Sequence, residues 1–317
     1  MKEKKSALKT NSRRKPWYKN TRLLQLYALC IIPVFLVILF NYVPMFGLII
    51  AFKDYRYDKG ILGSNWVGLK NFEFFFKSDD FARITWNTFS LNFIFIFCGI
   101  IAAVAVAILL FEIQRRASVK LFQTVMITPH FLSWVVVSYM AYALLNPQYG
   151  LVNSFLGKMG IAAVDWYTKP KAWPFILTVA SVWKHVGMDC VIYYASLMGL
   201  DTSLFEAADV DGATKWQKIK YITIPSLVPL LTILTILKIG NIFRADFGLF
   251  YQLTRDVGAL YSTTDVIDTY IFRTMRVLGR MSMSSAAGLL QSVVGFVLVV
   301  ATNHVSKKID PETGGLF

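Results

Sequence analysis

The stretch FEAADVDGATKWQKIKYITIP, residues 205–225, is polar but lies between two long apolar stretches. It contains three acidic residues and three lysines, and it ends in Pro225. The pair Asp211-Gly212 is a turn signal, whereas the residues on either side of it favour helix. We therefore predict two short helices that meet at Gly212.

The side chains of this segment suit contact with another protein. Ala207 and Ala208 allow close approach, and Trp216 offers a rigid apolar anchor. Pro225 fits the first turn of the next helix, where its missing N–H has no intrahelical partner to lose. We interpret the segment as a docking element, although its spacing also allows an amphipathic loop that lies on lipid headgroups.

The composition of the chain indicates an integral membrane protein. Of 317 residues, 56% are hydrophobic and 16% are charged, whereas soluble domains carry about 25% charged residues. Cys30, Cys98 and Cys190 all lie in apolar stretches and form no CxxC pattern. These cysteines are expected to be buried packing residues rather than disulfides or metal ligands.

Six apolar stretches are long enough to cross a bilayer core of about 30 Å as helices. Their continuous rather than alternating apolar pattern excludes a β-barrel. The predicted fold is therefore an all-α membrane protein with six transmembrane helices. The predicted spans are 23–40 (extending up to 52), 86–111, 121–145, 173–200, 225–243 and 285–301.

The distribution of basic residues predicts the orientation of the chain. Residues 1–22 hold nine Lys and Arg against one acid, and the loop 112–120 holds three against one, whereas residues 52–85 are nearly balanced. Cytoplasmic segments are richer in Lys and Arg, so both termini and residues 205–225 are expected in the cytoplasm. The first apolar stretch is too long for a signal peptide and lacks a cleavage pattern.

One membrane domain is the simplest organisation. We predict a basic leader at 1–22, a six-helix transmembrane domain at 23–305 with its polar loop at 201–225, and a cytoplasmic tail at 306–317. The net charge of +14 resides mostly in the leader. Attraction to anionic membrane lipid explains this excess without a nucleic-acid partner.

Polar residues inside predicted spans are candidate functional residues, because burying them in a bilayer is costly. The alternative is that Lys184, Asp189 and Lys238 only form ion pairs within the bundle or extend to the span ends. His130, beside Pro129, is expected to be a packing residue at a kink. The candidates are Trp183, Lys184, His185, Asp189, Tyr193 and Tyr194 in the fourth span, and Lys238, Asn241, Arg244 and Asp246 in or after the fifth.

Several motifs resemble one family. Glu206-Ala207-Ala208 and Asp211-Gly212-Ala213, followed by Ile222, Pro225 and Pro229, resemble the EAA signature of ABC-importer permeases. WVGLKNFEFFF (66–76) and NTF (87–89) are similar to sugar-type permeases. ADFGLFY (245–251) and TTDVIDTYIFR (263–273) resemble the LplB-like branch that serves oligosaccharide and complex-carbohydrate importers of Gram-positive type.

This resemblance implies a type I ABC-importer permease fold in the plasma membrane of a Gram-positive bacterium. It implies a second homologous permease, two ATPase subunits and an extracellular solute-binding lipoprotein as partners. The EAA segment would dock on an ATPase subunit, and the helices that flank it would line the sugar pathway. The chain has no GxxxxGK[ST] motif, so ATP and Mg²⁺ are expected to be used by the ATPase, and no cofactor or metal by this chain.

Two other classes were weighed against a permease. An ion-coupled secondary transporter needs intramembrane acids and paired broken helices, but Asp189 is the only acid deep in a predicted span. An intramembrane enzyme needs a nucleophile and a base, but no GxSxG or HExxH motif occurs. A permease subunit that is not itself an enzyme remains the favoured interpretation.

Overall fold

A computed structural model describes residues 21–113 and 115–309 of the chain. Almost all of the predicted leader and most of the predicted tail lie outside these residues. The described chain is predominantly helical, and its one sheet is a two-residue antiparallel pair, β1 (Lys53–Asp54) with β2 (Asn65–Trp66).

Five helical segments are long and apolar enough to cross a membrane, and a bent pair of helices makes a sixth crossing if the pair is counted as one span. The first crossing continues from α1 through shorter helical turns to Phe52. These segments confirm the predicted membrane-spanning helical fold. The helices with long straight runs are α1 (Thr21–Val37), α5 (Asp80–Phe111), α9 (Trp173–Met198), α12 (Ile224–Gly240) and α15 (Met281–Ile309).

The third crossing, predicted as one span over 121–145 with a kink beside Pro129, is broken there into two helices. Helix α6 (Arg116–Ile127) and the 3-10 turn η4 (Thr128–Phe131) are separated from α7 (Trp134–Leu145) by a bend of 99°. Pro129 cannot donate a backbone hydrogen bond, and Leu132 is extended with ψ of 136°. The Ser133 side chain then accepts from Val136 N at 3.3 Å and caps the start of α7.

The fifth crossing begins earlier than predicted. Pro225 lies in the first turn of α12 (Ile224–Gly240), as predicted, but the continuous helical segment starts ten residues before it, at Lys215. Helix α11 (Lys215–Lys218) passes into a π-turn, η7 (Ile219–Thr223), and then into α12. The π-turn pairs Ile224 N with Ile219 O, and this change of hydrogen-bond register lets the helix continue past a proline.

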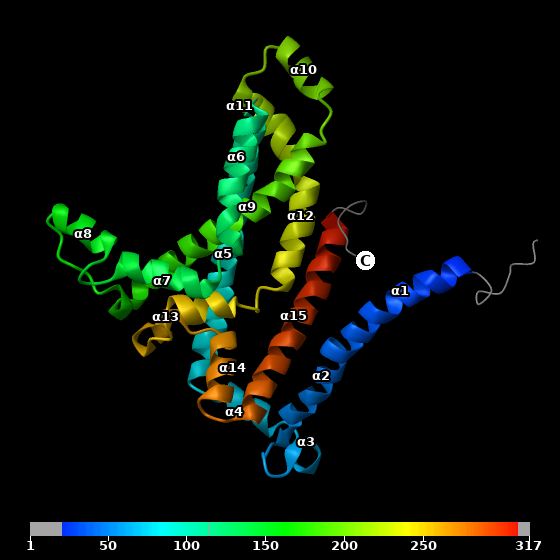
Figure 1. The fold of residues 1–317 in the computed structure, drawn as a ribbon, viewed down its shortest axis with the longest axis vertical. Helices are drawn as coiled ribbons and strands as arrows, with labels where there is room; N and C mark the ends of the chain where they lie inside the picture. Colours follow the sequence, from blue (N-terminus) through cyan, green and yellow to red (C-terminus); the bar gives the residue numbers. More distant parts are fainter. Residues whose placement is uncertain (1–20, 114, 310–317) are drawn as a thin grey trace, which may run out of the picture.

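Figure 1 shows how the crossings connect the two ends of the molecule. Helices α10 (Ser203–Val210) and α11 lie at the top, beside the start of α6. At the opposite end lie α3 (Gly60–Gly63), α4 (Lys70–Phe76) and α14 (Ile267–Arg276). Helix α1 leans away from the other helices, and its side chains from Gln25 onward are exposed.

The helices between these ends pack around small residues. Gly187 of α9 is buried where α6 crosses, and a Cβ at that position would lie 1.8 Å from the carbonyl oxygen of Met126. Trp173 and Leu177 of α9 pack with the π-turn η8 (Leu249–Leu253) in a second cluster of buried residues. The remaining short elements are α8 (Leu151–Lys158), η5 (Trp166–Thr168), η6 (Pro170–Ala172), η9 (Gly258–Leu260) and α13 (Tyr261–Thr264).

Candidate functional site

The polar segment 201–225 forms two short helices, α10 and α11, around Gly212. Gly212 has φ of +73°, the left-handed conformation that glycine adopts without strain. Ala213 N donates to Ala208 O at 2.9 Å across the end of α10. This bond and the left-handed glycine form a Schellman-type helix end. Local hydrogen bonding therefore explains why a glycine follows Asp211.

Helix α11 begins with a capping box. Thr214 Oγ1 accepts from Gln217 N at 3.4 Å, while the Gln217 side chain accepts from Thr214 N at 2.7 Å. Lys218 Nζ pairs with Asp209 Oδ1 at 2.7 Å and joins the two helices. The segment therefore has a defined shape of its own.

The predicted docking residues lie on the outside of this segment. Trp216 is 68% exposed and Val210 is 89% exposed, so both side chains are available for contact with another protein. Glu206, Ala207, Asp211 and Pro225 are exposed, while Ala208 and Ala213 are half-buried. The Phe205 ring lies 5.6 Å from the Phe111 ring at the end of α5 and anchors the segment to the bundle.

The start of the segment is also fixed by a local bond. Asp201 Oδ1 accepts from Ser203 N at 3.0 Å. This backbone hydrogen bond lowers the pKa of the Asp201 carboxyl below its usual value. Asp201 thus stays ionised at the first turn of α10, where the helix dipole favours a negative charge.

A polar cavity of about 490 Å³ lies between α5, α9 and α12. Apolar walls from Phe95, Leu234 and Leu249 surround its polar groups. The structure brings six of the ten predicted pathway residues together around it: His185, Asp189, Lys238, Asn241, Arg244 and Asp246. Such a mixture of apolar walls and few polar groups is typical of a small-molecule site.

The acids of this cavity already have partners. Lys238 Nζ and Asp189 Oδ2 form an ion pair at 2.5 Å between α12 and α9. Asp246 Oδ2 accepts from Trp134 Nε1 at 2.6 Å. The side chain of Arg244, which is exposed, makes no hydrogen bond or ion pair with the residues that the structure describes, although its charge interacts with the Asp268 carboxyl. The cavity therefore has one cation whose charge is not matched by a direct partner.

The other four predicted pathway residues lie away from this cavity. Trp183 lines a separate, apolar cavity of about 570 Å³ between α7 and α9. Lys184 is buried against the broken third crossing. Tyr193 is buried in an apolar cluster, with a hydroxyl that has no partner among the described residues, and Tyr194 packs beside it.

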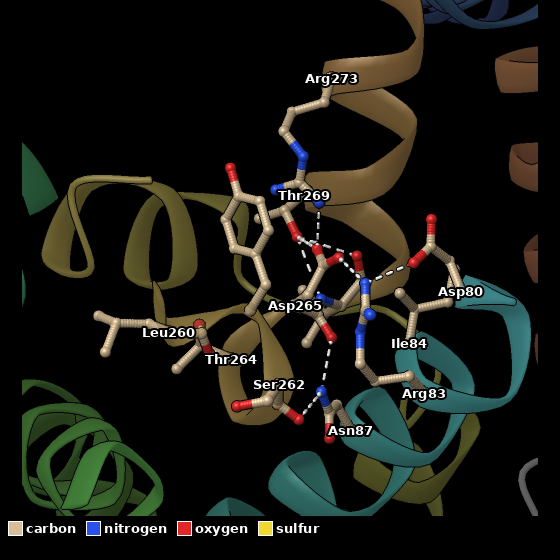
Figure 2. A network of polar contacts seen from close by, with 12 residues as sticks. Asp80, Arg83, Ile84, Asn87, Leu260, Ser262, Thr264, Asp265, Thr269 and Arg273 are labelled. Atoms are coloured by element: carbon tan, nitrogen blue, oxygen red, sulfur yellow. Dashed lines mark hydrogen bonds and ion pairs between the residues drawn. The ribbon is translucent and has the colours of Figure 1, made fainter. Parts of the chain in front are cut away.

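A network of charged residues at the end opposite to α10 was missed by sequence reasoning. Figure 2 shows Asp265, whose side chain is 1% exposed, between Arg83 of α5 and Arg273 of α14. The distances to Asp265 are 3.3 Å from Arg83 and 2.5 Å from Arg273. Thr269 Oγ1 donates to the same carboxylate at 2.9 Å. Asp265 thus joins two distant segments of the chain.

The same network explains two motifs that sequence analysis singled out only by resemblance. In NTF, Asn87 Nδ2 donates to Asp265 O at 3.0 Å, and Thr88 Oγ1 accepts from Ile267 N at 3.0 Å. In TTDVIDTYIFR, Arg273 also pairs with Asp256 at 3.0 Å. Co-occurrence of NTF and TTDVIDTYIFR is the available signal, because side chains of NTF bond to the backbone of TTDVIDTYIFR.

A second buried acid lies between this network and the cavity. Asp268 of α14 accepts from Ala245 N at 2.8 Å and from Gln291 Nε2 at 2.9 Å. Burial raises the pKa of the Asp268 carboxyl above its usual value. Asp268 therefore fixes the backbone next to Arg244 through its hydrogen bonds.

Comparison with known proteins places the chain in one group. Residues 95–311 match the family model for the binding-protein-dependent transport system inner membrane component. Protein LplB of Bacillus subtilis is 32% identical over 292 residues, 92% of this chain and 91% of that protein. The polygalacturonan/rhamnogalacturonan transport system permease protein YteP of the same species is 33% identical, over 87% and 85% of the two chains.

A solved structure has the same fold over nearly the whole chain. A chain from the crystal structure of a bacterial ABC transporter involved in the import of the acidic polysaccharide alginate superposes with a TM-score of 0.84 at 33% identity. The match covers 93% of this chain and 99% of that chain. A second structure of an alginate ABC transporter, in complex with an alginate pentasaccharide-bound periplasmic protein, has the same TM-score.

Proposed function

Because the chain belongs to the family of binding-protein-dependent transport system inner membrane components, we propose that its cargo is an oligosaccharide that passes through the α5–α9–α12 cavity. The chain is an integral membrane permease subunit of an ABC importer. It works with a solute-binding protein, a second permease and ATPase subunits, and these ATPase subunits hydrolyse the ATP. A secondary transporter or an intramembrane enzyme is no longer a competing interpretation.

The observation that carries the substrate proposal is the set of polar groups around the cavity. Asn241 and the Lys238–Asp189 pair supply donors and acceptors, and Phe95 supplies a ring. Sugar hydroxyls need both kinds of polar group. The names of the relatives, which refer to polygalacturonan, rhamnogalacturonan and alginate, support the same class.

The unpaired guanidinium of Arg244 favours an acidic sugar within that class. A guanidinium binds a carboxylate through two parallel hydrogen bonds, a geometry that lysine does not reproduce. The neighbouring acids Asp189 and Asp246 are each engaged elsewhere. A uronate carboxylate passing through the cavity would therefore meet a free cation in Arg244.

The remaining parts of the proposal concern topology and coupling. We place residues 201–225 and both termini in the cytoplasm of a Gram-positive cell, as the distribution of lysine and arginine suggests. Glu206, Gly212 and Trp216 would then contact an ATPase subunit. The chain itself would bind no cofactor, and ATP and Mg²⁺ would be bound by the ATPase.

The test compares two sugars in one assembled transporter. Arg244→Gln should lower uptake of a uronate oligosaccharide about tenfold, because a charge-assisted pair is lost, and should spare a neutral oligosaccharide of equal length. Uptake is measured in proteoliposomes with saturating sugar-loaded binding protein. Arg280→Gln, which removes an exposed arginine in the connection between α14 and α15 and outside the cavity lining, is the matched control.

Two results would count against parts of the proposal separately. Equal loss of acidic and neutral sugar in Arg244→Gln would remove the preference for uronates but keep the oligosaccharide pathway. A wild-type transporter that moves neither sugar, yet hydrolyses ATP with its binding protein, would contradict the oligosaccharide assignment itself.

A further inference from the structure

Lys184 of α9 is a buried cation that has no acidic partner among the described residues. Lys184 as a whole residue is only 6% exposed. The ammonium donates to the carbonyl oxygens of Pro129 at 3.2 Å, His130 at 3.0 Å and, most closely, Leu132. An ammonium has three N–H groups, so these bonds use all of its donors.

These carbonyls belong to the break in the third crossing. The 99° bend after η4 removes the backbone donors that a continuous helix would supply. In a bilayer such carbonyls have no water to bind, so each needs a partner from the protein. The positive charge of Lys184 also suits the C-terminal end of the helical segment, where the helix dipole is negative. Lys184 thus braces α9 against the broken crossing.

The brace continues to the wall of the polar cavity. Lys184 Nζ lies 5.2 Å from the centre of the Trp134 ring, at the start of α7. Trp134 Nε1 donates to Asp246 Oδ2 at 2.6 Å, and Asp246 lines the cavity. On the same ring, Trp134 Cδ1 would lie 2.3 Å from a Cβ at Gly248. Trp134 is therefore held tightly between Lys184 and the loop that carries Asp246.

We propose that Lys184 is a positioning residue for substrate passage. It holds the broken third crossing at an angle that places Trp134 on Asp246, and so keeps the Asp246 carboxylate in the cavity wall. Asp246 then has lone pairs left to accept from a passing hydroxyl-rich solute. That the solute is a sugar rests on the proposed function above, whereas the brace from Lys184 to Asp246 does not.

The first test separates positioning from general stability. Lys184→Met should lower oligosaccharide uptake about tenfold, while ATP hydrolysis stimulated by the loaded binding protein stays within about twofold of wild type. The matched control is Lys53→Met. Lys53 is also buried and also donates to two carbonyls, those of Ile61 and Leu62, but it lies in β1, far from the broken crossing. Lys53→Met should leave the amount of oligosaccharide taken up per ATP hydrolysed unchanged.

A double-variant cycle tests the path through Trp134. Trp134→Phe keeps a ring but removes the N–H that Asp246 accepts. If Lys184 acts through Trp134, the double variant should transport within about twofold of the weaker single variant. A loss of uptake of about a hundredfold in the double variant, the product of two independent losses of about tenfold, would overturn the proposal. A loss of ATP hydrolysis in Lys184→Met as large as its loss of uptake would also overturn it.

A third readout needs no knowledge of the solute. In a transporter without native cysteines, Asn241→Cys reports the shape of the cavity through its rate of reaction with a charged thiol reagent. Lys184→Met should change this rate several-fold and Lys53→Met should not; an unchanged rate would overturn the brace. If Lys184→Met does not assemble, Lys184→Arg takes its place. The donors of an arginine lie on separate nitrogens in one plane, so they cannot reach all three carbonyls as the single ammonium nitrogen does. The charge is kept, and a smaller change in the same direction is therefore expected.

Discussion

Gly212 illustrates how one backbone conformation shapes the docking segment. Its φ of +73° is unfavourable for a residue with a Cβ, yet no atom lies within 4 Å of the position that a Cβ would take. Substitution there therefore strains the backbone without creating a clash. Because strain occurs there without a clash, Gly212 is a suitable position for testing whether the backbone conformation of the loop matters for transport.

We expect Gly212→Ala to cost about 1 kcal/mol in the native loop, and Gly212→Val more, because a branched side chain tolerates the left-handed region poorly. A free-energy change of this size lowers the equilibrium constant for the native loop conformation roughly fivefold. Transport-coupled ATP hydrolysis should fall while the amount of subunit in the membrane stays unchanged. Gly212→Asn is the control and should retain most activity, because asparagine tolerates this conformation. Full coupled hydrolysis in Gly212→Val would contradict the role of the loop.

Single residues were predictable where the signal is local. Asp211-Gly212 is a turn signal in any sequence, and the structure has a turn there. Lys184 is a pathway candidate by sequence because it is a charged residue in a span. Its partners in the structure are backbone carbonyls, which no side-chain pattern reveals. Trp183 and His185 are two positions apart on one helix, so they cannot face the same cavity.

At the scale of elements, apolar content predicted the crossings but not their interruptions. The stretch 121–145 contains no charged Asp, Glu, Lys or Arg, and only Pro129 predicts a kink in it. The size of the break is not predictable from this stretch, because a lysine from another helix stabilises it. The fifth crossing was placed too late because Pro225 usually starts a helix. Here a π-turn precedes it and carries the helix past it.

The crossing of α6 and α9 depends on one glycine. A Cβ at position 187 would lie 1.8 Å from Met126 O, a backbone atom that cannot rotate away. Gly187→Ala should therefore lower the unfolding free energy by about 1–3 kcal/mol through overpacking. Gly157→Ala in α8 is the matched control, since no atom lies within 4 Å of its Cβ position. Thermal unfolding of the detergent-solubilised transporter measures both, and equal midpoints for the two variants would show that α6 yields easily.

At the scale of the whole molecule, the two polar ends are expected on opposite sides of the membrane. Cysteines introduced at Lys70 and Lys169 should react with an impermeant thiol reagent added outside intact cells, and a cysteine at Lys218 only after the membrane is opened. The basic leader and the loop 112–120 supply the reason. Labelling of position 218 from outside would contradict both the orientation and the proposed contact with the ATPase.

The overall fold was predictable because lipid restricts the choices to continuous helices of a given length. The cavity was partly predictable, because polar groups in spans are few and six of them converge. The network around Asp265 was not, since it joins residues far apart in the chain, and separation of this kind leaves no periodic signal.

That separation has a consequence for how the subunit is made. Arg83 and Asp265 are 182 residues apart, and ribosomes add roughly 5 to 20 residues per second. The arginine is therefore synthesised roughly 10 to 40 seconds before the carboxylate that it finally contacts. During this interval Asp80, 2.6 Å away in the finished protein and three residues earlier in the chain, is the counter-ion within reach. Helix α5 thus has a counter-ion for Arg83 before Asp265 is synthesised, and the Arg83–Asp80 ion pair is still present in the folded protein.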